Sequence, residues 1–135
     1  MNILICFILT FIMFLIYLLV ENNLLIVRKY KINLNISDSK KLKIVQISDL
    51  HNKKYPHDWQ LLYGRIKSLS PDIIIISGDL VSRNQTDFKY TGKLIKKLSD
   101  ICPVFYSKGN HELDLSQENI SELRNEVIKN GAVFL

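Results

Sequence analysis

The sequence predicts an α/β domain with a layered, largely parallel sheet, preceded by one apolar N-terminal helix. From about residue 41 onward, short apolar runs rich in β-branched residues alternate with amphipathic helical segments. Parallel strands need a long crossover between them, so this alternation is typical of a parallel sheet. Ahead of it, residues 1–20 carry no Lys, Arg, Asp or Glu. We therefore expect an N-terminal anchor helix over residues 1–23 and a folded domain over residues 24–135.

The apolar segment Ile3–Val20 reads "ILICFILTFIMFLIYLLV" and, as a helix, would be about 27 Å long, close to the roughly 30 Å hydrocarbon core of a bilayer. It lacks the basic start and the Ala-x-Ala-like exit of a cleaved signal peptide. We predict an uncleaved single-pass membrane anchor, with a signal peptide as the alternative. Arg28, Lys29 and Lys31 follow the helix, which weakly favours a cytoplasmic domain. The side of the membrane stays open, because these residues fall in a predicted strand.

The elements of the domain are predicted from the period of their apolar residues. Alternation at period two over residues 26–36 predicts an amphipathic strand, and "DIIIIS" is apolar on both faces, which is typical of a central parallel strand. Gly131 is the predicted stop of the last helix. The expected strands are 26–36, 43–48, 72–77, 103–107 and 132–135, and the expected helices are 58–69, 88–99 and 116–129.

The helical period also predicts which residues of each helix face the core. Apolar residues, and one threonine, recur at spacings of three and four along each predicted helix, which puts them on one face. These residues are Trp59, Leu62, Ile66 and Leu69 in the first helix of the domain, Thr91, Leu94, Ile95 and Leu98 in the second, and Ile120, Leu123 and Val127 in the third.

The net charge of +5 comes from scattered lysines rather than from an Arg-rich or aromatic-interleaved stripe. We therefore expect no specific nucleic-acid partner. A lysine-rich surface suits an anionic membrane, and plain solvation of the surface is the alternative. Cys6 lies in the apolar segment and Cys102 precedes a predicted core strand, so no disulfide is expected between them.

Polar residues follow three successive predicted strands. The carboxyl ends of parallel strands meet at one edge of a sheet, and α/β sheets bind ligands there. We therefore expect two carboxylates, two imidazoles and one amide to gather at that edge. The loops read "DLH", "GD" and "GNHE", and they contribute Asp49, His51, Gly78, Asp79, Asn110 and His111.

These residue types suit divalent metal ions. Carboxylate oxygens and imidazole nitrogens bind borderline ions such as manganese, zinc or ferrous iron. Asp49 and His51, two apart on an extended segment, can hold one ion, Asp79 can bridge two, and Asn110 offers its carbonyl oxygen to the second. His111 is left free to act as an acid. Two metals about 3.5–4 Å apart would clamp the attacking and leaving oxygens of a phosphoryl transfer.

Three supporting residues and a competing interpretation complete the prediction. Gly78 lets the backbone turn without a side chain in the way, and Gly109 and Glu112 support the site from within "GNHE". A single Asp after a strand is more often a turn or helix-cap residue. Three such loops in order, about thirty residues apart, argue against that interpretation. His57, in "YPHD", is expected to be a surface residue.

Together the loops resemble the blocks D-x-H, G-D and G-N-H-D/E of the calcineurin-like metallophosphoesterase superfamily. "QISDLHN" and "YSKGNHE" are the specific parts, and the apolar helix ahead of them is similar to the membrane-anchored bacterial branch. The resemblance implies a hydrolase that cleaves a phosphate monoester, phosphodiester or pyrophosphate bond with a hydroxide bridging two divalent metals (Mn, Fe or Zn). Asp49 and His51 would bind the first metal, Asp79 would bridge, and Asn110 would bind the second. His111 would stabilise the transition state and protonate the leaving group.

The same branch hints at the substrate. Some of its members hydrolyse nucleotide-diphosphate sugar lipids, which fits a protein held at a membrane. The resemblance therefore implies a phosphate-ester substrate, with a nucleotide-sugar lipid or another membrane-associated phosphoester as the narrower expectation. A haloacid-dehalogenase-type phosphatase is a different catalytic class and would need D-x-D after the first strand, so "DLH" argues against it.

The resemblance also implies that residues 24–135 form the N-terminal half of the family domain. Family members carry three further histidines in a second half, one alone and two in a G-H-x-H block, and that half supplies a second sheet. This sequence has three histidines, His51, His57 and His111. We therefore expect an incomplete sheet with one exposed apolar face and a fragment of a longer reading frame. The alternatives are an enzyme completed by a second polypeptide and a catalytically inactive, membrane-bound interaction module.

Overall fold

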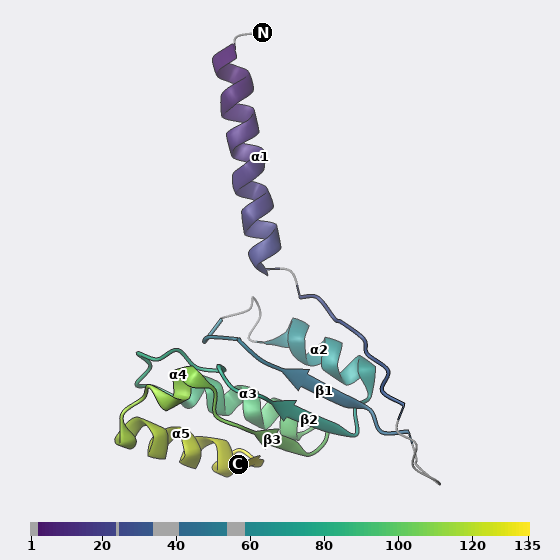
Figure 1. Ribbon diagram of the computed structural model, residues 1–135, viewed down its shortest axis with the longest axis vertical. Coiled ribbons are helices and arrows are strands. Elements are labelled where there is room, and N and C mark those ends of the chain that lie inside the picture. The colour runs from purple at the N-terminus through teal and green to yellow at the C-terminus, as the bar shows by residue number, and fades with distance from the viewer. Residues whose placement is uncertain (1–2, 24, 34–40, 54–58) are drawn as a thin grey trace. The chain divides into compact units, whose positions relative to one another are not determined.

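A computed structural model describes residues 3–23, 25–33, 41–53 and 59–135, and the chain divides into two units, Met1–Ile36 and Ser37–Leu135 (Figure 1). The first unit contains α1 (Ile3–Asn23). This helix is long and apolar enough to cross a membrane by length and composition. One such helix near the N-terminus is weak support for the predicted anchor, because a signal sequence has the same properties.

The strand predicted over residues 26–36 is wrong where the structure describes it. Residues 25–33 form neither helix nor strand, and residues 34–36 lie outside the described part of the chain. Alternation of side chains gives a strand only where a neighbouring strand accepts and donates backbone hydrogen bonds. No such ladder includes residues 25–33.

The second unit is built on a four-stranded parallel sheet with the strands in chain order, β1-β2-β3-β4. The predicted α/β class and the four later strands are confirmed. Ile47, Ile76 and Tyr106 stand in one row across the sheet, so β1, β2 and β3 end together. The strands are β1 (Ile44–Ile47), β2 (Ile73–Ile76), β3 (Val104–Tyr106) and β4 (Ala132–Phe134).

Three crossover helices join the strands, and a short helix that was not predicted follows β3. Strands that follow one another in the same direction, with crossovers of one hand, place their connecting helices on one face of the sheet. Thr91, Leu94, Ile95 and Leu98 of α3 are buried, as predicted, whereas Leu69 and Ile120 are only half-buried. The helices are α2 (Gln60–Leu69), α3 (Lys89–Ser99), α4 (Asn110–Leu113) and α5 (Gln117–Lys129).

The core of this unit lies between the helices and one face of the sheet. Ile74, Ile76, Val104 and Tyr106 alternate onto that face and are almost fully buried. The opposite face carries alternating apolar residues that remain half-buried or exposed in the described structure; the predicted incompleteness of the sheet stays a prediction. These residues are Ile44, Ile73, Ile75, Phe105 and Val133.

Candidate metal centre

The loops after β1 and β2 run side by side and are joined by backbone hydrogen bonds. The amides of Asp49, His51 and Asn52 donate to the carbonyl oxygens of residues 78, 79 and 80 at 3.4, 3.0 and 3.0 Å. Asp49, His51, Asn52 and Asp79 all have positive φ, from 44° to 57°. The prediction that Asp49 and His51 lie on an extended segment is therefore wrong. Aspartate, asparagine and histidine are the non-glycine residues that adopt this region most readily.

Two glycines allow the second and third loops to approach one another. Gly78 has a φ of 95°, and a Cβ there would collide with the backbone of Gly109. A Cβ on Gly109 would lie 2.6 Å from the backbone nitrogen of Asp79. Because neither position has room for a side chain, the loop after β2 and the start of α4 pack backbone against backbone.

The buried carboxylate of Glu112 ties these loops together. Its Oε2 accepts hydrogen bonds from the amides of Asp79 and Gly109, both at 2.8 Å. Its Oε1 accepts from the amides of Leu80 and Val81, at 2.9 and 3.2 Å, and from the Tyr106 hydroxyl at 2.8 Å. Glu112 is completely buried. Five donors replace the water that a carboxylate of this kind would otherwise require.

The hydroxyl of Tyr106 is held in its protonated form by this arrangement. Burial raises the pKa of Tyr106, and the negative charge of Glu112, which the hydroxyl faces, raises it further. A protonated hydroxyl is a donor, which is what the Glu112 carboxylate needs. The buried end of β3 and the start of α4 are therefore joined through one side-chain hydrogen bond.

The structure brings His51, Asp79 and His111 together. One ligand atom of each residue lies within 4.8 Å of the others. The rings of His51 and His111 have centroids 4.3 Å apart. The backbone amide of His111 also donates to Asp79 Oδ1 at 2.9 Å. Residues from three successive loops therefore meet at the carboxyl edge of the sheet.

The two remaining predicted ligands lie at the margin of this cluster. Asp49 is exposed, and its Oδ1 lies 3.8 Å from Nε2 of His51. The Asn110 amide lies against the Asp79 carboxylate, and the near amide atom is 2.7 Å from Oδ2 and 3.1 Å from Oδ1. With nitrogen on that side the amide donates to both oxygens. With oxygen on that side, three acceptors face one another, which is the arrangement a cation stabilises.

Two observations show that the cluster suits a ligand: its donor set fits a divalent metal ion, and one buried nitrogen of His111 lacks a hydrogen-bond partner among the described residues. The donor set of carboxylate, imidazole and amide oxygen is the one that manganese, zinc and ferrous iron prefer. In addition, Nδ1 of His111 is buried and has no hydrogen-bond partner among the described residues. A buried polar atom left alone is costly, and a bound group is a common reason for it. His57 lies outside the described residues, so its predicted place at the surface is not addressed.

Two residues of the loop after β2 that were not predicted also contact the cluster. Arg83 places Nη2 3.3 Å from Nε2 of His111. The hydroxyl of Ser82 donates to the carbonyl oxygen of His51 at 3.2 Å. Their position in the sequence, three and four residues after Asp79, could have indicated this contact. The loop that carries Asp79 continues past the other two loops, so its next residues lie close to them.

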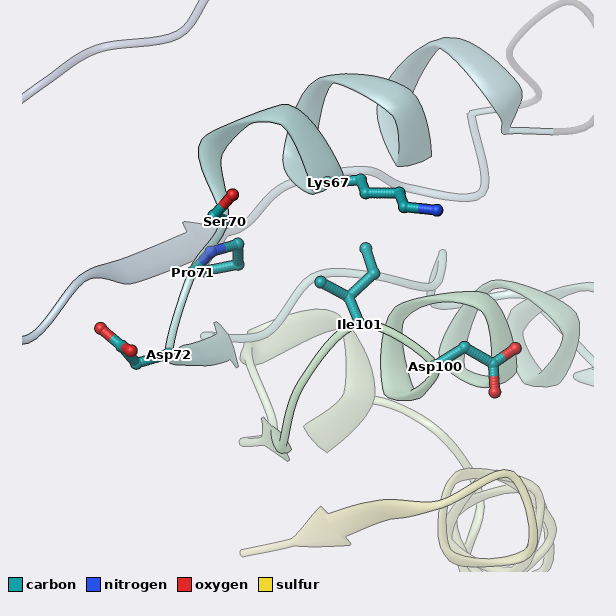
Figure 2. A pocket seen from close by; sticks show the side chains of 6 residues that line it. All are labelled: Lys67, Ser70, Pro71, Asp72, Asp100 and Ile101. Atoms are coloured by element: carbon teal, nitrogen blue, oxygen red, sulfur yellow. The ribbon is translucent and has the colours of Figure 1, made fainter.

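A shallow pocket of about 500 Å³ lies at the opposite, amino edge of the sheet (Figure 2). Asp72 and Ile101, which line it, precede β2 and β3. Its acidic groups already have partners, because Asp72 accepts from the amide of Lys43 and Asp100 pairs with Lys96. Within the described part of the chain, both acidic groups of the pocket are therefore satisfied, unlike Nδ1 of His111 at the carboxyl edge. Cys6 and Cys102 are both free thiols in the structure.

Comparison with known proteins supports the assignment of the loop cluster to a metal-dependent phosphoesterase fold. A family model described as calcineurin-like phosphoesterase matches residues 42–134. The chain is 37% identical over 105 residues to the uncharacterized metallophosphoesterase Cj0846 of Campylobacter jejuni, across 73% of this chain and 27% of that protein. It is 32% identical over 98 residues to the uncharacterized metallophosphoesterase YkoQ of Bacillus subtilis, across 71% of this chain and 36% of that protein.

The match covers only part of those relatives. The aligned region spans about a third of their length or less. Within this chain, however, the family model runs through all four strands and through the three loops that form the cluster. The predicted resemblance is confirmed: the chain belongs to the calcineurin-like phosphoesterase family.

Proposed function

We propose that this chain carries the metal-binding loops of a phosphoesterase and hydrolyses a phosphate ester or a pyrophosphate bond. The observation that carries the proposal is the meeting of His51, Asp79 and His111 within 4.8 Å at the carboxyl edge of a parallel sheet. Ligand sites in sheets of this kind lie at that edge. Family membership supports the same chemistry.

The side chains would divide the work as follows. By the family resemblance, Asp49, His51, Asp79 and Asn110 would hold divalent ions, and Asp79, which has two carboxylate oxygens, would be shared between them. Bound ions would neutralise charge on the phosphoryl group and activate water. His111 would donate a proton to the leaving oxygen, since its buried Nδ1 has no acceptor among the described residues.

Glu112 has a structural part in this proposal. It holds the amides of Asp79 and Gly109 on a single oxygen at 2.8 Å, which fixes the distance between the second and third loops. Groups that orient metal ligands from behind typically change metal affinity by 10- to 100-fold when they are altered. We therefore expect Glu112 to affect metal binding without touching the metal.

The narrower substrate proposal is a phosphoester associated with a membrane. The apolar helix α1 supports it, as does the resemblance to a branch that includes hydrolases of nucleotide-diphosphate sugar lipids. A comparison of a lipid-linked diphosphate in micelles with a water-soluble nucleotide diphosphate tests this point. A higher kcat/KM for the lipid-linked compound is expected, and equal values would reject the membrane-associated substrate.

The activity itself is tested with the full chain in detergent micelles. With manganese added, we expect hydrolysis of a chromogenic phosphodiester or phosphomonoester, and we expect Asp79→Asn to abolish it. Asp100→Asn is the matched control, because Asp100 belongs to an exposed ion pair before β3. Metal binding without turnover on any of these substrates would favour the inactive interaction module and would reject the enzyme.

A further inference from the structure

Arg83 lies against the outer nitrogen of His111. It follows Asp79 by four residues, and its Nη2 is 3.3 Å from Nε2 of the imidazole. A guanidinium has only hydrogen-bond donors and stays protonated in proteins. The contact is therefore a hydrogen bond only when Nε2 presents its lone pair. In a neutral imidazole the single ring proton then resides on Nδ1.

Asp114 holds the guanidinium from its other side. Arg83 Nη1 lies 3.5 Å from Asp114 Oδ2, and the two side chains are about half exposed. Asp114 ends the short helix α4, and its amide donates to the carbonyl oxygen of Asn110 at 3.1 Å. Asp114 and His111 are therefore carried by the same turn of backbone. Arg83 reaches both with different nitrogens, which a planar guanidinium can do and a lysine ammonium cannot.

The rest of the ring environment leaves the choice of tautomer to Arg83. His51 contributes a tilted ring with its centroid 4.3 Å away, and Asp79 accepts from the backbone amide of His111 rather than from its ring. Nδ1 has no hydrogen-bond partner among the described residues. When one imidazole nitrogen is hydrogen-bonded, that bond decides which nitrogen carries the proton.

We propose that Arg83, held by Asp114, is a positioning residue that keeps the ring proton of His111 on Nδ1. An imidazole fixed in this way presents an N–H at a buried position where the described residues offer no acceptor. The consequence for catalysis rests on the proposed function, in which a substrate oxygen supplies that acceptor. The tautomer itself does not depend on activity.

Long-range proton–nitrogen correlation NMR measures the tautomer directly. The full chain in detergent micelles, without added metal and at a pH where the ring is neutral, provides the sample, and His111→Gln identifies the signals by their loss. We expect the Nδ1–H form to exceed the Nε2–H form by about tenfold, the size of one net hydrogen bond. We expect Arg83→Gln to remove that excess and Arg83→Lys to restore only part of it.

Matched variants distinguish the effect of the Arg83–Asp114 pair from the effect of a general change in surface charge. Asp114→Asn should lower the tautomer ratio by about threefold or more, in keeping with an exposed pair. Asp100→Asn, which breaks a similar exposed pair, and Arg65→Gln, which removes an exposed arginine of α2, should leave it unchanged. A wild-type ring protonated on Nε2, or a ratio unaffected by Arg83→Gln, would overturn the proposal.

The outcomes also distinguish this proposal from the proposed function. A ratio that responds to Arg83→Gln in a chain that hydrolyses no phosphoester supports the positioning of His111 and rejects the enzyme. If the chain hydrolyses the substrate normally and Arg83→Gln leaves the tautomer ratio of His111 unchanged, the positioning role of Arg83 is rejected and the proposed function stands. A response of the ratio together with a fall in kcat at unchanged KM supports both.

Discussion

Replacing Glu112 by Gln tests whether one buried carboxylate holds the metal loops together. Gln keeps the volume of the side chain but replaces one acceptor oxygen with an NH2 group. If the remaining oxygen faces the amides of Leu80 and Val81 and the Tyr106 hydroxyl, the NH2 group faces the amides of Asp79 and Gly109. Two partly buried N–H groups then lose their acceptor and meet another donor.

The size of the effect follows from those two bonds. A buried donor left unsatisfied costs about 1–3 kcal/mol. Glu112→Gln should therefore lower the free energy of unfolding by about 2–6 kcal/mol, a large share of the 5–15 kcal/mol typical of a domain. Guanidinium unfolding of the full chain in micelles, followed by the fluorescence of Trp59, measures the change. Trp59 is buried and is the single tryptophan of the chain, so it reports on the second unit.

The control for this measurement is Glu122→Gln, an exposed glutamate of α5. An exposed substitution of this kind usually changes stability by less than about 0.5 kcal/mol. If Glu112→Gln unfolds within about 1 kcal/mol of the wild type, the carboxylate does not organise the loops and the reasoning is refuted.

Three further predictions follow from single side chains. Gly109→Ala should destabilise the chain by about 1–3 kcal/mol in the same assay, because its Cβ would lie 2.6 Å from a backbone nitrogen. Gly64→Ala is the control: its Cβ would meet open space, so it should stabilise α2 by up to about 1 kcal/mol. The raised pKa of Tyr106 gives stability that is complete below about pH 10 and falls above it by about 1.4 kcal/mol per pH unit, so the advantage of wild type over Tyr106→Phe should shrink between pH 9 and 11. Burial, and then the charge of a neighbouring carboxylate, raise the pKa of Cys102, so in a Cys6→Ser background its alkylation at pH 8 should be slower than that of a free thiol; an equal rate would contradict this.

Most of the fold was predictable because short apolar runs rich in β-branched residues usually form buried strands. The runs at β1, β2 and β3 match the predicted strands, and the buried residues of α3 match its predicted face. The predicted strand over residues 26–36 failed where it is described, because alternation does not reveal whether a partner strand exists. The helix α4 was missed because it depends on Glu112 reaching back to the Gly109 amide, a contact that needs the folded loops.

The candidate site was predictable in membership but not in detail. Spacing alone indicated that Asp79 and His111 would meet, since each follows the end of an adjacent parallel strand. The left-handed backbone of Asp49 and His51 was not predictable, because it comes from hydrogen bonds to the neighbouring loop. Arg83 was missed for the same reason, since sequence spacing does not show which way a loop turns after it leaves the sheet. The metal-binding and catalytic roles of these residues stay predictions.

Metal binding by the loop cluster is tested most directly by calorimetric titration of manganese into the full chain in micelles. We predict saturable binding that Asp79→Asn weakens by at least about tenfold and that Asp100→Asn leaves unchanged. Two ions per chain would support the dinuclear arrangement with Asp79 as the bridge. Heat that never saturates, or equal affinity in the wild type and Asp79→Asn, would contradict the claim that the three loops form a metal site.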